Sequence, residues 1–299
     1  MRSKRVSVGI SAYNEEKNIK NVLRDILSQN QNGWKLKEIL VYCDGCTDKT
    51  AENVMKIKNR HIKLVNDGRR AGKTKRVGQI FHEFDGDYIV MFDADIRLSG
   101  RNIINNLMDA FDKNPNIRLV GGNSIPFFPK TFFEKANYST FMVFYQSRTT
   151  LHCGQNIFGC TGHCLALRRD LAREIKFPKI MNEDVYIYLF NKSMGYDFYH
   201  VHKAVVYYKL PTKLSDYLKQ IFRSNPEAVH QNFERYFDKL VSEEYRRPFK
   251  FYAAAIFKVF LEDPLPTMYI IIINIIAQPF YAFITKRYKV AWPTAQSTK

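Results

Sequence analysis

The chain has 299 residues, of which 45% are hydrophobic, and this is enough apolar material for one large domain or for one domain with an appendage. That share excludes a chain that is disordered throughout. The formal net charge of +17 predicts an anionic partner, which can be nucleic acid, an anionic membrane surface or a phosphorylated substrate. Because the sequence opens on a strand-like segment without a secretory signal, we expect a cytosolic protein with reduced thiols.

Strands and helices alternate over the first hundred residues. Apolar runs that predict strands are each followed by polar residues, and apolar residues at helical spacing come between them. This pattern predicts a largely parallel sheet with a site along its carboxyl edge. The expected strands are 6–10, 38–42, 62–65 and 89–92, and the expected helices are 19–27, 74–84 and one that ends at residue 55.

The same reading continues through the next hundred residues. We expect strands over 118–122 and 204–208, and helices over 102–111 and 131–150. Residues 159–168 are expected to start as a Gly-bearing turn and to become an apolar strand. Another helix is expected to begin near Met181–Val185, where two acidic residues can complement the positive end of the helix dipole. Pro211 marks the end of this globular part.

Two carboxylates follow the most apolar of these strands. Asp93 and Asp95 are one residue apart, so that an extended chain places their side chains on the same side. Hard oxygen ligands at the carboxyl end of a strand suit a divalent cation that also holds phosphate oxygens. The alternative interpretation of such a pair is a solvated loop.

Polar residues after the other strands complete a possible site for a nucleotide-activated substrate. An acid such as Asp44 can hold ribose hydroxyls or base donors, and Lys73 can lie near a diphosphate. Farther along, Glu183 and Asp184 offer a general base. The remaining candidates for contacts with the nucleotide and its sugar are Ala12, Tyr13, Glu15, Gln220 and Arg223.

The cysteines have two interpretations. Cys43 and Cys46 form a C-x-x-C pair, and three further cysteines could supply more thiolate ligands, but the second group lacks zinc-finger spacing. The spacing therefore favours small buried cysteines over zinc or redox chemistry.

The C-terminal part differs in composition from the rest. Amphipathic helices are expected over 213–222 and 249–261, and the second suits a membrane interface. Residues 264–284 contain no charged side chain, and about 20 apolar residues suffice to cross a bilayer. We therefore expect a globular domain over 1–210, interface helices over 211–262, a single transmembrane helix over 263–285 and a basic tail over 286–299.

Together these residues resemble the motifs of the inverting glycosyltransferases of family 2, which have a GT-A fold. The segments Ser7–Glu16 and Asp44–Asp48 are similar to the family's opening loop and nucleotide-binding turn, and Asp93-Ala-Asp95 is similar to its metal-binding motif. Asn182-Glu-Asp184 resembles the acidic motif whose last Asp is the catalytic base. Gln220-Ile-Phe-Arg223 resembles the Q-x-x-R-W motif of membrane-embedded synthases of cellulose, chitin and hyaluronan, although Ser224 replaces the Trp.

The resemblance implies an α/β fold with a Rossmann-like mixed sheet flanked by helices. It also implies a nucleoside-diphosphate-sugar donor, a Mg²⁺ or Mn²⁺ cofactor on Asp93 and Asp95, and Asp184 with Glu183 as catalytic residues. Gln220 and Arg223 are implied to hold the diphosphate or the acceptor. The expected acceptor is a hydroxyl of a lipid-linked glycan, a glycolipid or a polysaccharide at the cell membrane, with the catalytic domain in the cytoplasm and membrane lipids as partners.

Three other functions compete with this prediction. A polyprenyl-phosphate (dolichyl-phosphate) glycosyltransferase shares the front half and a membrane tail, and it is distinguished by its acceptor. A nucleotidyltransferase usually carries a Gly-rich basic loop after the first strand, where this chain has the acidic segment Ala12–Glu16. A nucleic-acid-binding protein would fit the charge, but no binding module is recognisable, and anionic lipid explains the charge more economically.

Overall fold

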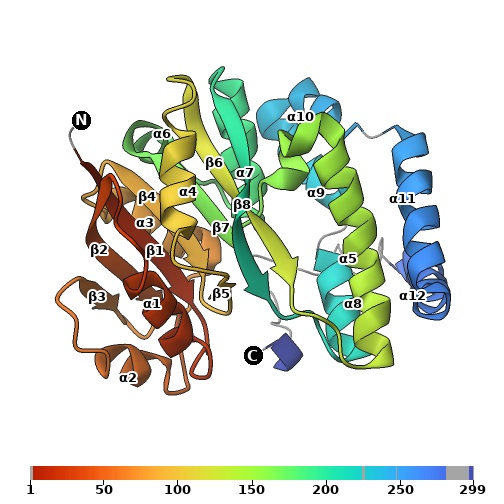
Figure 1. The fold of residues 1–299 in the computed structure, drawn as a ribbon, viewed down its shortest axis with the longest axis horizontal. Helices are drawn as coiled ribbons and strands as arrows, with labels where there is room; N and C mark the ends of the chain where they lie inside the picture. The colour runs from red at the N-terminus through yellow and green to blue at the C-terminus, as the bar shows by residue number, and fades with distance from the viewer. Residues whose placement is uncertain (1–2, 224–225, 247, 281–295, 299) are drawn as a thin grey trace. The chain divides into compact units, whose positions relative to one another are not determined.

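The computed structural model describes residues 3–223, 226–246, 248–280 and 296–298. Its contacts divide the chain into two compact units. The first, here named the sheet unit, comprises residues up to Ile125 together with Gly159–Tyr208. The second, the helical unit, comprises Pro126–Phe158 and Lys209–Thr298. Figure 1 shows the strands of the first unit and the helices of the second.

The sheet unit is built on one eight-stranded sheet with the strand order β3-β2-β1-β4-β7-β6-β8-β5. Strands β3, β2, β1 and β4 are parallel, whereas β7 is antiparallel to both β4 and β6. The strands are β1 Lys4–Ala12, β2 Trp34–Cys43, β3 Ile62–Val65, β4 Tyr88–Asp93, β5 Arg97–Leu98, β6 Ile117–Pro126, β7 Cys164–Arg168 and β8 Asp197–Tyr208. The helices are α1 Ile19–Leu27, α2 Thr50–Met55, α3 Lys73–Glu83, α4 Ile103–Ala110, α6 Arg169–Glu174 and α7 Glu183–Ser193.

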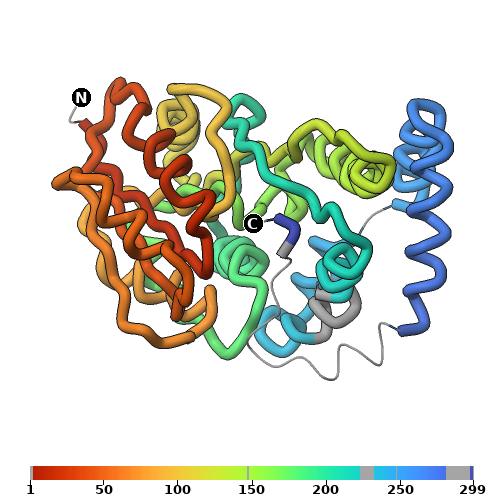
Figure 2. Tube along the Cα trace, turned by 90° about the horizontal axis from the view of Figure 1, so that it is seen from below, coloured from red at the N-terminus to blue at the C-terminus, as the bar shows by residue number. Residues whose placement is uncertain are grey.

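Apolar residues on alternate positions of the central strands form the main core. Val8, Val41 and Val90 are fully buried, and they pack in one cluster with the apolar faces of α1 and α4. Figure 2 shows α1 and α4 on the same side of the sheet. On the opposite side α3 approaches β1 so closely that a Cβ on Gly9 would lie 2.7 Å from Ile80 Cγ2. Gly9 therefore lets this helix pack tightly against the strand.

This topology gathers several chain segments at one edge of the sheet. Strands β1, β2 and β4 all end there because they are parallel, and β7 begins there because Phe92 of β4 pairs with Cys164 at the start of antiparallel β7. The segments that leave or enter the sheet at this edge are thus held next to each other by backbone pairing.

The helical unit is organised around α5, Phe132–Thr150, which packs against both α11 and α12. The buried residues of these contacts include Ala136 with Ile270 and Val143 with Val259. The other elements are α8 Leu214–Arg223, α9 Pro226–Phe237, α10 Lys239–Glu244, α11 Phe249–Glu262, α12 Pro264–Ala277 and the short helices η1 Leu151–Gly154, η2 Ile157–Gly159, η3 Gln278–Phe280 and η4 Gln296–Thr298.

The apolar segment near the C-terminus is only partly described. Helix α12 covers 14 residues, and η3 continues to Phe280. Within the described ranges no helix has both the length and the apolar character needed to span a bilayer. Residues 281–285 of the expected transmembrane helix, and the expected tail from 286 to 295, lie outside the described residues.

The structure confirms the α/β class and the predicted mixed sheet flanked by helices. The helix expected to end at residue 55 is α2, which begins at Thr50, and the Asp48 carboxylate accepts a hydrogen bond from the Thr50 N–H at 2.9 Å. The domain boundary near 210 stays a prediction. The contacts show one feature that the sequence did not predict. Pro126–Phe158 belongs to the helical unit, although it lies between β6 and β7 in the chain.

Candidate active site

The candidate active site lies in the sheet unit, at the edge where β1, β2 and β4 end. Asp93 is the last residue of β4, and its N–H donates a hydrogen bond to the His163 carbonyl in the turn before β7. Lys73 and Glu183 are the first residues of α3 and α7. Four separate chain segments therefore contribute to one site.

The ammonium group of Lys73 joins two of the predicted acidic residues. Its Nζ lies 2.7 Å from Asp93 Oδ1 and 2.7 Å from Glu183 Oε1. Burial alone would lower the pKa of Lys73, but the two carboxylates outweigh it and raise the pKa well above the ordinary value. Burial raises the pKa of Glu183, and Lys73 opposes this shift. Lys73 is thus the counter-ion of the site.

A further carboxyl group, that of Asp95, lies in the turn directly after β4. The surrounding protein removes much of its water, and this burial raises its pKa; the charges of Asp93 and Glu15 raise it further. His163 and Lys73 lower it, but only in part. Burial and the neighbouring carboxylates together therefore favour the protonated form of Asp95 more than water would.

Asp184 is fixed by hydrogen bonds from the backbone. Its Oδ2 accepts the Gly162 N–H at 3.0 Å, and its Oδ1 accepts the Val185 N–H at 2.9 Å. A Cβ on Gly162 would lie 3.2 Å from Lys73 Nζ and 3.3 Å from Glu183 Oε1. A glycine at this position leaves room for the charged groups around it.

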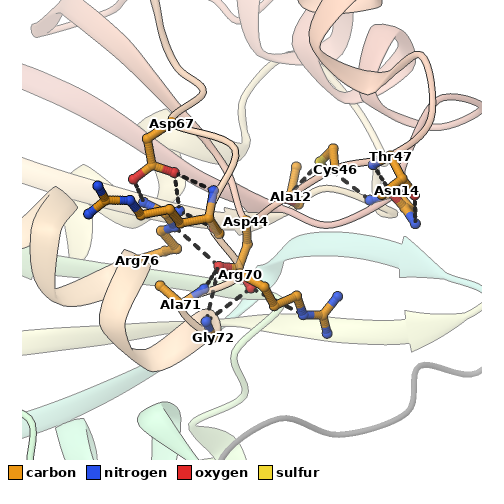
Figure 3. Close-up of polar contacts among 11 residues, drawn as sticks. Ala12, Asn14, Asp44, Cys46, Thr47, Asp67, Arg70, Ala71, Gly72 and Arg76 are labelled. Carbon is orange, nitrogen blue, oxygen red and sulfur yellow. Dashed lines mark hydrogen bonds and ion pairs between the residues drawn. The ribbon is translucent and has the colours of Figure 1, made fainter.

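Asp44 is buried and accepts hydrogen bonds from other parts of the protein. It is 3% exposed, and its carboxylate accepts hydrogen bonds from the Ala71 N–H at 2.6 Å, from the Gly72 N–H at 3.0 Å and from Arg76 Nε at 3.2 Å. Figure 3 shows these bonds converging on Asp44 from the loop that leads into α3 and from Arg76 of that helix. Asp44 therefore holds the segment that carries Lys73.

Beside Asp44, an arginine and a tyrosine form a stacked pair. The Arg70 guanidinium carbon lies 3.1 Å from the centroid of the Tyr13 ring, and Arg70 Nε is 3.7 Å from Asp44 Oδ2. Such cation–π contacts orient a planar cation over the ring face. Ala12 is buried at the end of β1, where its carbonyl accepts the Asp44 N–H at 2.8 Å.

The structure brings most of the predicted site residues together. Lys73, Asp93, Glu183 and Asp184 share one cluster of charges with Asp95. Glu15 is 7% exposed and contributes to the same electrostatic environment. Tyr13, Ala12 and Asp44 form a second group, in which Arg70 lies over the Tyr13 ring and the Ala12 carbonyl accepts the Asp44 N–H. Their contacts with a nucleotide or a metal stay predictions.

Gln220 and Arg223 belong to the helical unit. Gln220 is an exposed residue of α8, and Arg223 ends that helix. Their predicted role toward the diphosphate or the acceptor stays a prediction.

Three residues of the site were not predicted from the sequence. Gly162 supplies a backbone donor to Asp184, and Arg76 and Arg70 contact Asp44. The Gly-bearing turn before β7 signals a close approach of the backbone, which could have pointed to Gly162. Nothing in the local pattern distinguishes the buried Arg76 from the exposed basic residues around it.

Comparison with known proteins identifies the family. Residues 7–176 match the family described as Glycosyl transferase family 2. Poly-beta-1,6-N-acetyl-D-glucosamine synthase of Staphylococcus epidermidis is 29% identical over 119 residues, which are 40% of this chain and 28% of that protein. The synthase of that name from Staphylococcus aureus (strain COL) is 29% identical over 115 residues, or 38% of this chain and 27% of that protein. The chain thus matches less than a third of the length of these relatives.

Solved structures share the fold. The mannosyltransferase PcManGT from Pyrobaculum calidifontis, in complex with GDP-Man and Mn²⁺, has a TM-score of 0.60 at 20% identity, covering 95% of this chain and 83% of that one. Glucosyl-3-phosphoglycerate synthase from Mycobacterium tuberculosis, in complex with Mn²⁺, UDP and phosphoglyceric acid, has a TM-score of 0.57 at 17% identity, covering 78% of each chain. These similarities confirm the expected GT-A-like fold. Since the family match extends over more than half of its residues, the chain belongs to glycosyl transferase family 2.

Proposed function

We propose that this chain is a metal-dependent, inverting glycosyltransferase that moves a sugar from a nucleoside-diphosphate donor to an acceptor hydroxyl. The observation that carries the proposal is a cluster of four charged residues, in which Lys73, Glu183 and Asp184 lie around Gly162 and Lys73 also pairs with Asp93. A diphosphate leaving group needs cations, and an attacking hydroxyl needs a base. The cluster offers residues for both.

The side chains fit a divalent cation. Asp93 and Asp95 supply hard oxygen ligands, and the raised pKa of Asp95 reflects burial and negative charge that Lys73 does not balance. Among the described residues no three His, Cys, Asp or Glu side chains form a metal-holding group. Asp93 and Asp95 would therefore hold Mg²⁺ or Mn²⁺ together with the donor's phosphate oxygens. Such an ion stabilises the charge of the departing diphosphate.

The chain's own residues supply the remaining steps. Asp184, oriented by the Gly162 and Val185 N–H groups, would accept the proton of the attacking hydroxyl at one of its carboxylate oxygens. Lys73 would turn from Asp93 toward the diphosphate, since an ammonium that bridges carboxylates can also pair with phosphate. The Arg70–Tyr13 pair would border the nucleotide.

For the acceptor, we propose a hydroxyl of a lipid-linked glycan, a glycolipid or a polysaccharide at a membrane, with the sheet unit on the cytoplasmic side. The positioned Asp184 supports a hydroxyl acceptor, because a polyprenyl phosphate is already ionised and needs no base. The exposed apolar side chains of α11 and α12 support contact with lipid. They include Phe257, Leu261, Leu265, Ile272 and Ile275.

The test is release of nucleoside diphosphate from UDP- and GDP-sugars by the purified chain, with Mn²⁺ or EDTA, with and without a lipid extract. Release that needs the metal supports the proposal. Asp184→Asn is expected to slow transfer to hydroxyl acceptors by about 10²–10⁴-fold. Asp112→Asn, on an exposed ion pair with Lys4, is the matched control and should stay active.

Two results would contradict this assignment. Full activity of Asp184→Asn would exclude Asp184 as the base. A product that carries the sugar directly on a single lipid phosphate would favour the polyprenyl-phosphate reaction instead.

A further inference from the structure

Cys43 and Cys46 flank the turn formed by Asp44 and Gly45. Cys43 is the last residue of β2 and is fully buried, whereas Cys46 is half-buried. Between them the backbone bends at Asp44 and Gly45, and Gly45 has a φ of +68°. The bend returns the chain toward β1, so that the Cys46 thiol lies 3.3 Å from the Ala12 carbonyl, which accepts its hydrogen bond. The two cysteines thus flank one bend.

The two thiols have different chemical character. The pKa of Cys46 is lowered to about 6: the hydrogen bond with Cys43 is the main cause, the Asn14 N–H at 3.5 Å from Cys46 Sγ also lowers this pKa, and burial opposes the shift. Its hydrogen bond with Cys46, together with burial, raises the pKa of Cys43. Among charged neighbours, Asp48 raises both values and Arg76 lowers that of Cys43. A half-buried thiol with a lowered pKa beside a buried thiol with a raised pKa is the arrangement of an attacking and a resolving cysteine.

The bend packs directly against the loop before α3. A Cβ on Gly45 would lie 2.9 Å from the Arg70 backbone nitrogen, so these two segments are in direct contact. Asp44, between the cysteines, accepts the Ala71 and Gly72 N–H groups, and Lys73 follows immediately. A disulfide has an S–S length of about 2.05 Å and a fixed torsion preference, so closing it must draw the two sulfurs together and reshape the bend.

We propose that Cys43 and Cys46 are a reversible modification site, at which a disulfide forms and disturbs the Asp44 contacts that hold the Lys73 loop. The effect of this disulfide on donor binding rests on the proposed function. The oxidant is a low-molecular-weight disulfide. The Cys46 thiol loses its proton, attacks one sulfur of the small disulfide and expels one thiolate; Cys43 then loses its proton, attacks the Cys46 sulfur and expels the second thiolate, and the two released protons neutralise the two expelled thiolates. Two protein thiols become one disulfide, and the small disulfide becomes two thiols.

The first experiment measures the bond itself. The full chain with Cys153→Ser, which removes an exposed thiol, is equilibrated over a series of reduced and oxidised glutathione ratios. Remaining thiols are alkylated, and peptides are identified by mass. We expect joint loss of the Cys43 and Cys46 thiols and a linked peptide that disappears in Cys43→Ser. A pair that stays reduced in excess oxidised glutathione, or that yields only a glutathione adduct on Cys46, would overturn the proposal.

The rate of alkylation as a function of pH tests whether the pKa of Cys46 is lowered. Because its pKa is lowered, Cys46 is expected to react with iodoacetamide at a rate that levels off well below pH 8, whereas an ordinary thiol gains reactivity up to about pH 8.5. Reaction of Cys46 with the pH profile of the Cys153 thiol in the unmodified chain would contradict the assignment.

The second experiment separates the disulfide from the donor site. UDP and GDP binding is measured for the reduced, oxidised and re-reduced Cys153→Ser chain, and we expect oxidation to weaken binding at least about tenfold, or about 1.4 kcal/mol, with recovery on reduction. Cys46→Ser should lose this response to oxidant. Equal binding by both forms would overturn the coupling. If the reduced chain bound neither nucleotide, the proposed function would fail, while the glutathione titration would still decide whether the disulfide forms.

Discussion

Arg76 is a buried cation that serves two acidic side chains. Its guanidinium is 1% exposed, and it contacts Asp44 at 3.2 Å and Asp67 at 2.6 Å. Burial opposes the charge of Arg76, but the hydrogen bond with Asp67 outweighs it and raises the pKa of Arg76. The position of Asp44 therefore depends on Arg76, a residue that was not predicted from the sequence to belong to the site.

Replacing Arg76 should reveal this dependence as lost stability. Arg76→Met removes the buried cation beside Asp44 and leaves only the partly exposed Arg70 near this carboxylate. We expect a loss of about 3 kcal/mol in the free energy of unfolding, measured with urea. Arg97→Met is the control, because Arg97 is 49% exposed in its pair with Asp25 and should cost at most about 1 kcal/mol. Equal losses in the two variants would show that Arg76 is not a buried structural cation.

Lys73 occupies carboxylate oxygens that a divalent cation would also use. In the absence of donor its ammonium must therefore compete with the metal for Asp93. We expect Lys73→Gln to bind Mn²⁺ more tightly than the unaltered chain when no nucleotide is present, as measured by electron paramagnetic resonance. Lys75→Gln, which changes an exposed lysine of the same helix, should leave Mn²⁺ affinity unaltered. Weaker Mn²⁺ binding by Lys73→Gln would mean that the ammonium supports the metal.

At the level of elements, hydrophobic patterning was informative because it reflects burial. The runs around Val8, Val41 and Val90 predicted strands, and these residues are fully buried in the sheet. The predicted strand over 89–92 then placed Asp93 at the edge of the sheet, and the polar segment before the predicted helix over 74–84 contained Lys73. The pairing of Lys73 with Glu183 was not predictable, since it depends on how α3 and α7 meet and no local pattern records that contact. The same limit applies to Gly162.

Gly9 shows how one strand position decides the packing of a whole helix. A Cβ there would lie 2.6 Å from Met91 Sδ and 2.7 Å from Ile80 Cγ2. Gly9→Ala should therefore lower the free energy of unfolding by about 1–3 kcal/mol, as a shift of the urea midpoint. At Gly100 nothing lies within 4 Å of an added Cβ, so Gly100→Ala should stay within about 0.5 kcal/mol of the unaltered chain. If Gly9→Ala left the free energy of unfolding unchanged, α3 would be able to move away from β1 without loss of stability.

For the whole molecule, the net charge of +17 and the apolar faces of α11 and α12 favour the same partner, an anionic lipid surface. We expect the chain to float with vesicles that contain anionic lipid. Replacing the exposed Ile272 and Ile275 by Asp should abolish flotation, whereas replacing the exposed Met55 of α2 by Asp should not. If the Ile variants still floated, and high salt removed the flotation, charge alone would account for binding to the vesicles.

The separation of β4 from its partner β7 along the chain has a consequence for synthesis. The ribosome must add the whole segment between Asp93 and Cys164, including α5, before β7 can pair with β4. At about 5–20 residues per second this takes roughly 4–14 s. During that interval the parallel strands β1–β4 can assemble, but one side of β4 has no final partner. Glu183 and Asp184 emerge later still, so a nascent chain carries Lys73 and Asp93 well before the residues that complete the site.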